Sequence, residues 1–157
     1  MKAEPVLLAQ TDIDVPLDYA RRWFYELADH PERYTFNSHA GFTFTQGSFG
    51  ETGAQFQTEE RFAGVRLRLE FELTGVEARR FTFQLQKPLD RIWGYFELDP
   101  LDEGTTQLSL GIGSDQAPQR ALLRAPLVRG AVQAQIEGEV AHIAESMENL
   151  YQPQQEG

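Results

Sequence analysis

The clearest pattern along the chain is an alternation of apolar and charged residues between positions 65 and 73. Every second residue is apolar and every residue between them is charged; the apolar set is Val65, Leu67, Leu69, Phe71 and Leu73. Successive side chains of a β-strand point to opposite faces. This stretch therefore predicts a strand in an antiparallel sheet with one buried face and one face in water.

Weaker alternation predicts further strands on both sides of this stretch. We expect a first strand at Val6–Ile13, followed later by six strands at about residues 42–49, 54–62, 65–74, 80–86, 91–98 and 105–113. The gaps between the six strands are short and rich in Gly, Pro and Asp, which is typical of tight turns. Short turns between consecutive strands indicate that neighbours pair in antiparallel fashion.

The hydrophobic period changes to that of a helix in two regions. After Pro16, four apolar residues keep the spacing of one helix face: Ala20, Trp23, Phe24 and Leu27. Pro31 ends this region, so two short helices fit before the second strand. After the last strand the sequence predicts a short helix to Ala125, a break at Pro126 and a long helix to about Tyr151.

The long C-terminal helix carries two stripes of different bulk. Large apolar residues form one stripe: Val132, Ile136, Val140, Ile143, Met147 and Leu150. Small residues form the stripe beside it: Gly130, Ala131, Ala134, Gly138, Ala141 and Ala144. Glycine inside a helix costs about 1 kcal/mol relative to alanine. We therefore expect larger side chains to be unwelcome at Gly130 and Gly138, because of close packing on the sheet or because of a bound ligand.

These elements together predict an α+β fold. A curved antiparallel sheet of about seven strands would wrap around the long C-terminal helix, with two short helices between the first two strands. A helix of 25 residues is about 37 Å long, so it can lie across the apolar face of the sheet and leave a cavity beneath it. The length of 157 residues suits one domain, which we place at residues 1–152, with a flexible tail at 153–157.

Composition narrows the range of partners. The chain has 14 Lys and Arg against 24 Asp and Glu, a formal net charge of -10, which disfavours nucleic acid and anionic membrane surfaces as partners. The absence of Cys excludes disulfides, thiolate metal ligands and Cys nucleophiles, and it fits a cytoplasmic protein. The sequence has neither a secretion signal nor a stretch long enough to insert across a membrane.

The His residues give no sign of a metal site. His30, His39 and His142 are far apart, without the close spacing that metal-binding motifs have. We therefore expect no metal and no cofactor.

One acidic residue interrupts an apolar strand face in the segment FQTEERF at residues 56–62. Side chains that alternate place Glu60 on the same face as Phe56, Thr58 and Phe62. If Ala63 and Gly64 form a two-residue hairpin loop, Glu60 pairs with Leu67 and points inward. A slip of one residue would bury two charged side chains and a Gln instead, which is a worse core.

An inward acid requires a partner or a proton. The nearest candidates by type are His30, Tyr34, Asn37 and His39, which lead into the second strand. Glu60 with His39 would form an acid–base pair able to move protons on a bound carbonyl compound. The alternatives are an internal hydrogen bond of structural value only, or a position at the rim of the cavity where Glu60 reaches water.

The order of elements and several local motifs resemble the START / polyketide cyclase (SRPBCC) superfamily, which has the helix-grip fold. The resemblance covers nearly the whole chain and rests on VPLDYARRWFYELADHPERY, GSFGETGAQF, GYFELDPLDEGTTQL and VAHIAESMENL. It implies a cavity under the last helix for a small hydrophobic molecule such as a lipid, a quinone or a polyketide. Some members are cyclases, aromatases or hydrolases and others are binding modules, and no catalytic signature of the superfamily is present to choose between them.

Three functional hypotheses follow. The first is binding or transport of a small hydrophobic ligand, lined by Phe44, Phe56, Glu60, Leu69, Phe71, Phe83, Phe96, Leu110, Val140, Ile143 and Met147. The second is an enzyme of the cyclase, aromatase or hydrolase kind that uses Glu60 with His39. The third is an interaction module, such as a homodimer, through Trp93 and Tyr95, which alternation places on the convex face of the sheet.

Overall fold

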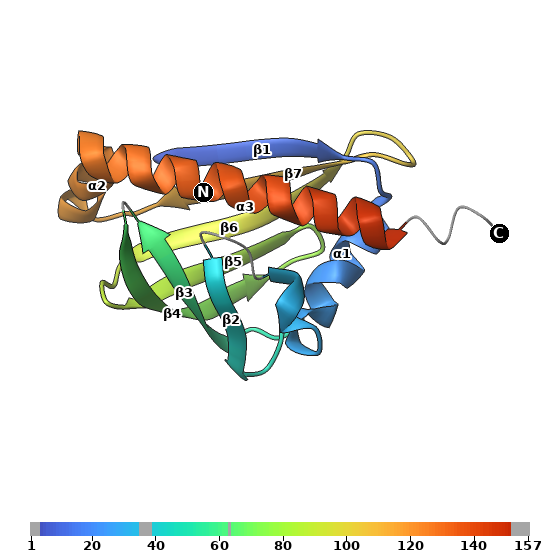
Figure 1. Cartoon of the computed structure of the whole chain (residues 1–157), viewed down its shortest axis with the longest axis horizontal. Helices are drawn as coiled ribbons and strands as arrows, with labels where there is room; N and C mark the ends of the chain where they lie inside the picture. The colour runs from blue at the N-terminus through green and yellow to red at the C-terminus, as the bar shows by residue number, and fades with distance from the viewer. Residues whose placement is uncertain (1–3, 35–38, 63, 152–157) are drawn as a thin grey trace.

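The computed structural model describes residues 4–34, 39–62 and 64–151, and its centre is a seven-stranded antiparallel sheet (Figure 1). The strands lie in the order β1-β7-β6-β5-β4-β3-β2, so β2 to β7 form a meander and β1 joins it beside β7. Their bounds are β1 Leu7–Ile13, β2 His39–Gln46, β3 Gln55–Phe62, β4 Val65–Val76, β5 Arg80–Lys87, β6 Ile92–Pro100 and β7 Thr106–Gly113.

The helices lie on one side of this sheet and at its ends. α1 (Leu17–Tyr25) and two 3-10 turns, η1 (Glu26–Ala28) and η2 (Pro31–Tyr34), connect β1 to β2. α2 (Ala117–Arg124) leads into α3 (Pro126–Tyr151), which crosses the concave face of the sheet (Figure 1). The predicted α+β helix-grip architecture is confirmed, although the second short helix is a 3-10 turn. The proposed tail at 153–157 lies outside the described residues.

The hairpin between β3 and β4 has the predicted register. Glu60 pairs with Leu67, Thr58 with Leu69 and Phe62 with Val65. On the opposite face Glu59 stands across from Arg68, and their charged groups are 3.6 Å apart. The register places Glu60 on the concave face of the sheet, as expected from the two-residue period.

The second strand begins and ends three residues earlier than the alternation predicts. β2 ends at Gln46, and Gly47 follows with a φ of 74°, a conformation in the left-handed region that favours glycine. Phe49 lies beyond the strand, yet its side chain is fully buried. Its apolar character therefore reflects a loop residue that packs into the core, where the pattern suggested a strand residue.

Aromatic side chains fill the end of the concave face that α1 covers. The Phe24 ring packs against the rings of Phe49, Phe81 and Phe96, with centroid distances of 5.5, 5.3 and 5.0 Å. Phe49 is in turn 5.5 Å from Phe56 on β3. These ring contacts fill the space between α1 and this half of the sheet.

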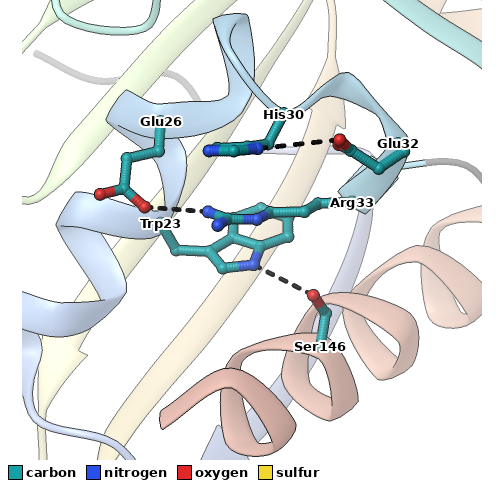
Figure 2. A network of polar contacts seen from close by, with 6 residues as sticks. All are labelled: Trp23, Glu26, His30, Glu32, Arg33 and Ser146. Carbon is teal, nitrogen blue, oxygen red and sulfur yellow. Dashed lines mark hydrogen bonds and ion pairs between the residues drawn. The ribbon is translucent and has the colours of Figure 1, made fainter.

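Polar contacts hold the helical insert, which is the segment of α1, η1 and η2 between β1 and β2, against α3 (Figure 2). The indole Nε1 of Trp23 donates to Ser146 Oγ at 3.1 Å, and Nε2 of His142 donates to the carbonyl oxygen of Arg33 at 3.0 Å. Figure 2 also shows the Arg33 guanidinium on Glu26, at 2.9 Å, within the insert itself. α1 and η2 are thus held to the C-terminal half of α3 from two directions.

The two glycines of α3 do not mark close contacts, contrary to the sequence-based expectation. A Cβ atom built at Gly130 or at Gly138 would meet no atom within 4 Å, and both residues are exposed. Neither packing against the sheet nor space for a ligand requires glycine there. The small stripe therefore turns toward solvent over part of its length.

Replacing Gly138 with alanine should stabilise the protein. The change removes backbone freedom from the unfolded chain without a clash, so we expect Gly138→Ala to raise the free energy of unfolding by about 0.5–1 kcal/mol. Gly94→Ala on β6 is the contrasting variant, because its Cβ would lie 2.5 Å from the Phe83 ring. Urea unfolding of both variants measures the difference; destabilisation by Gly138→Ala would show that this glycine has a role in the fold.

Candidate functional site

A cavity of about 410 Å³ lies between α3 and the concave face of the sheet. β2 to β7 contribute apolar side chains from below, and α2 and α3 close it from above. Its volume is within the range of small-molecule sites, which are mostly apolar with a few convergent polar groups. The aromatic packing under α1 ends where this cavity begins, because Phe56 and Phe96 belong to both.

Most of the residues predicted to line a cavity do line it. They are Phe56, Glu60, Leu69, Phe71, Phe83, Phe96 and Leu110. Contact of these residues with a ligand stays a prediction.

Four predicted lining residues lie elsewhere. Val140, Ile143 and Met147 are buried in the packed core of the C-terminal half of α3, and Phe44 packs on Phe42, Phe49 and Phe56 at the edge of the sheet. The predicted apolar stripe of α3 is present in the structure. Under its C-terminal half, however, α1 fills the space in which a cavity was expected. The cavity lies under the first half, where Ala131, Val132 and Ile136 face it.

Glu60 lines the cavity and accepts hydrogen bonds from two side chains. The Thr58 hydroxyl donates to Oε2 at 2.5 Å, and the Gln135 amide of α3 donates to Oε1 at 3.1 Å. Only 5% of Glu60 is exposed. The acid is thus held in position from both β3 and α3.

A second buried acid, Glu139, lies one helical turn beyond Gln135. The Tyr34 hydroxyl of η2 donates to its Oε1 at 2.7 Å, and both residues are almost fully buried. Glu139 and Glu60 interact electrostatically. Together with Tyr34, Thr58 and Gln135 they form what we call the polar end of the cavity.

Burial raises the pKa values of the two acids and of Tyr34 at the polar end. Loss of water raises the pKa of Glu60 to about 7, against the lowering effect of the hydrogen bonds from Thr58 and Gln135. Burial and the charge of Glu60 together hold the pKa of Glu139 well above its usual range. The pKa of Tyr34 is raised well above 10 by burial and by Glu139, so its hydroxyl keeps its proton and donates.

The polar end differs in detail from the pair predicted from sequence. Tyr34 bonds to Glu139, and His30 lies on the surface 3.7 Å from Glu32. The backbone of His39 pairs with that of Glu60 across β2 and β3. Asn37 lies outside the described residues. Among the proposed partners, His39 is therefore still a candidate through its position in the register.

Sequence reasoning missed Gln135 and Glu139, although a signal for them existed. Gln135, Glu139, His142 and Ser146 follow one another at spacings of four, three and four residues, which puts them on one face of α3. Each has a hydrogen-bond partner on another element. A polar stripe beside an apolar one indicates a helix face that packs on polar groups.

Trp93 and Tyr95 lie on the sheet where β7 carries glycine. The ring of Tyr95 lies over Gly111 and that of Trp93 over Gly113, since a Cβ at either glycine would be 2.5 or 2.7 Å from the ring. The Arg80 guanidinium covers Tyr95 at 3.9 Å from the ring centroid. The rings fill space left by glycine. Their role in a homodimer stays a prediction.

Charge in the cavity has one sign. The described residues that line it include Glu60 and Glu139 but no Lys, Arg or His. In the described part of the chain, no group of three His, Asp or Glu side chains is placed to hold a metal ion.

Within the described residues, no helix has the length and apolar character needed to span a bilayer.

The cavity reaches the surface at the end where α2 meets α3. Leu89, Leu122 and Leu127 line the cavity and are nevertheless exposed, Leu127 by 90%. They come from the β5–β6 turn, from α2 and from the first turn of α3, which Figure 1 shows at one end of the molecule. We call this opening the mouth.

The sheet, the covering helix and the cavity define a helix-grip protein with the fold of the START / polyketide cyclase proteins. The chain is similar to a START superfamily protein from Mycobacterium smegmatis, with a TM-score of 0.63 and 13% identity over 94% of this chain and 97% of the other. It is also similar to the ZhuI aromatase/cyclase from a Streptomyces species, with a TM-score of 0.64 and 11% identity over 93% and 92%.

A protein from Thermus thermophilus has the same fold, with a TM-score of 0.65 and 18% identity over 90% of this chain and 95% of that one. No protein-family model matches the sequence, and neither does any curated protein. At these identities the similarity establishes the fold.

The protein should become less stable as the pH rises from 4.5 to 7. The unfolded chain ionises Glu60 near pH 4.5, whereas the folded chain keeps the proton to about pH 7. The folded state then binds more protons, so the free energy of unfolding decreases as the pH rises through this window. We expect Glu60→Gln to flatten the decrease, at about 1.4 kcal/mol for each unit of pKa shift.

Denaturant unfolding at pH 5 and pH 8 measures this effect. Glu59→Gln is the matched control, since Glu59 lies on the wet face of the same strand. An equal pH dependence in the parent and in Glu60→Gln would contradict the assignment of the buried proton to this acid.

Proposed function

We propose that the protein binds a small, largely apolar molecule in the cavity under α3. The observation that carries this proposal is a cavity of about 410 Å³ with apolar walls and polar groups gathered at one end. Apolar walls exclude water and favour apolar ligand surface, while a few fixed polar groups determine orientation. The fold that this chain has in common with START-type and cyclase proteins supports the same conclusion.

The polar end indicates the chemistry of the ligand. Two buried acids face the cavity with no cationic side chain among the described lining residues. A ligand carboxylate would meet like charges in a poorly solvated site. A ligand amine, or a hydroxyl that can donate, would instead meet acceptor oxygens. We therefore infer an apolar molecule whose polar group is a hydrogen-bond donor or a base.

A bulky residue inside the cavity should abolish binding. Ala131 lines the cavity from α3, whereas Ala134 on the same helix is exposed. We expect Ala131→Trp to remove saturable binding of the neutral probe Nile red and Ala134→Trp to retain it. Fluorescence titration gives the comparison. Equal binding by both variants would place the probe outside this cavity and contradict the proposal.

The head-group preference should depend on the acids. With decylamine, decanol and decanoate competing against the probe at pH 7.5, we expect the amine to bind roughly tenfold more tightly than the carboxylate, a difference of about 1.4 kcal/mol. Glu60→Gln combined with Glu139→Gln should remove this preference because the amides cannot ionise. The control is Glu137→Gln, an exposed position on α3. A preference for decanoate in the parent would overturn the inferred ligand class.

A second candidate function is acid–base catalysis on a bound carbonyl compound. The pKa of about 7 for Glu60 favours it, because a general acid or base works best when its pKa is near the operating pH. His39, whose backbone pairs with Glu60, is the proposed second group. In a screen of candidate substrates, Glu60→Gln should lower turnover by 100-fold or more if this function is correct, on the order of what a single general acid contributes. Unchanged turnover would eliminate it.

A further inference from the structure

The mouth of the cavity is surrounded by apolar side chains that are exposed to water. Leu127 is 90% exposed, and Leu89 and Leu122 are also exposed. Val65 in the β3–β4 hairpin is exposed as well, two residues before Leu67, which lines the cavity. Water contact at four large apolar residues in three neighbouring segments is unfavourable. A patch of this kind beside an opening is typical of a surface that binds a membrane or another protein.

Basic residues accompany this apolar patch. The segments 61–66, 87–91 and 117–129 form the hairpin, the β5–β6 turn and the α2–α3 region around the mouth. They contain seven Lys and Arg but a single acid, Asp90; the basic residues are Arg61, Arg66, Lys87, Arg91, Arg120, Arg124 and Arg129. Half of the chain's 14 basic residues therefore lie at one end of a protein whose net charge is -10.

These basic side chains are available to a partner. All seven residues are exposed, and among the described residues none of them forms an ion pair. On α3 itself the first acid is Glu137. Two acids lie beside the basic segments: Asp115 accepts a hydrogen bond from Trp93 Nε1 at 3.3 Å, and Glu70 pairs with Lys87 across β4 and β5. The seven basic residues outnumber these acids. Charges more than about 8 Å apart are largely screened at physiological salt. An approaching surface thus experiences the local positive charge of the mouth.

We propose that the mouth docks on the surface of a lipid bilayer that contains anionic lipids. The arginines would contact lipid phosphates, and Leu127 with its neighbours would enter the boundary between head groups and acyl chains. Arg and Lys suit this position because their stems pack on apolar surface while the charged ends stay in water. The docked cavity opens toward the phase in which an apolar ligand is concentrated. The proposal does not depend on which ligand the cavity binds.

The net charge suggested the opposite conclusion from sequence. A charge of -10 spread evenly would repel an anionic surface. Antiparallel connections instead gather particular turns at each end of the sheet, and the turns at the mouth end carry the arginines. The segregation of charge becomes visible once the β3–β4 hairpin, the β5–β6 turn and the α2–α3 region are seen to meet.

Vesicle flotation with the full chain tests the proposal. We expect about tenfold stronger binding to phosphatidylcholine vesicles that contain phosphatidylglycerol than to pure phosphatidylcholine, and weaker binding as salt is raised. Leu127→Asp, and Arg120→Glu combined with Arg124→Glu, should each reduce this binding at least tenfold. Ala131→Trp should still bind the vesicles, because filling the cavity leaves the mouth surface in place.

Matched variants at the opposite end of the sheet serve as controls. Leu101 in the β6–β7 turn is 50% exposed, and Arg79 lies in the β4–β5 turn. Leu101→Asp and Arg79→Glu should bind vesicles as the parent does, with circular dichroism reporting that every variant is folded. Absence of binding to the anionic vesicles, equal binding to both vesicle types, or equal losses in the control variants would each overturn the proposal, as would recognition of an acidic protein in place of the bilayer.

Discussion

The contact between α3 and the concave face of the sheet is the interaction on which the rest of the structure depends. The meander from β2 to β7 has one apolar face; α3 crosses this face above the cavity, and α1 packs on one end of it. α3 does so with two adjacent faces, an apolar one that includes Ile143 and Met147 and a polar one from Gln135 to Ser146. Non-directional apolar contact supplies stability, while the hydrogen bonds fix the rotation of the helix about its axis.

This arrangement explains where the cavity lies and what it contains. α1 and the aromatic rings around Phe24 and Phe49 occupy the space under one half of α3, and among the described residues no comparable element fills the space under the other half. The boundary between the two halves is where Glu60 and Glu139 meet their donors. Two acids can be buried there because at least one proton stays with them at neutral pH. The helix that creates the cavity thus also supplies its polar end.

The sequence predicted those features that depend on local rules. The inward direction of Glu60 follows from the two-residue period of β3 and a short hairpin loop, and both hold in the structure. The partners of Glu60 and Glu139 on other elements were not predictable in this way, since Tyr34 and Glu139 are 105 positions apart and meet only in the folded chain. Val140 and Met147 were assigned to the cavity because an apolar stripe has the same pattern whether the space opposite is filled or empty. Gly138 shows the converse, since composition alone suggested a constraint that the fold does not impose.

The polar stripe of α3 has a consequence for motion. The side-chain hydrogen bonds from α3 to the rest of the fold begin at Gln133, which donates to the Leu8 carbonyl, and continue from Gln135 to Ser146, while the first turns of the helix line a cavity. Regions with few packed neighbours open at lower free energy than regions with many. The N-terminal end of the helix therefore opens locally at a lower free energy than the C-terminal end. Local opening of the N-terminal end, with the fold preserved at the other end, would give the proposed ligand a route into the cavity.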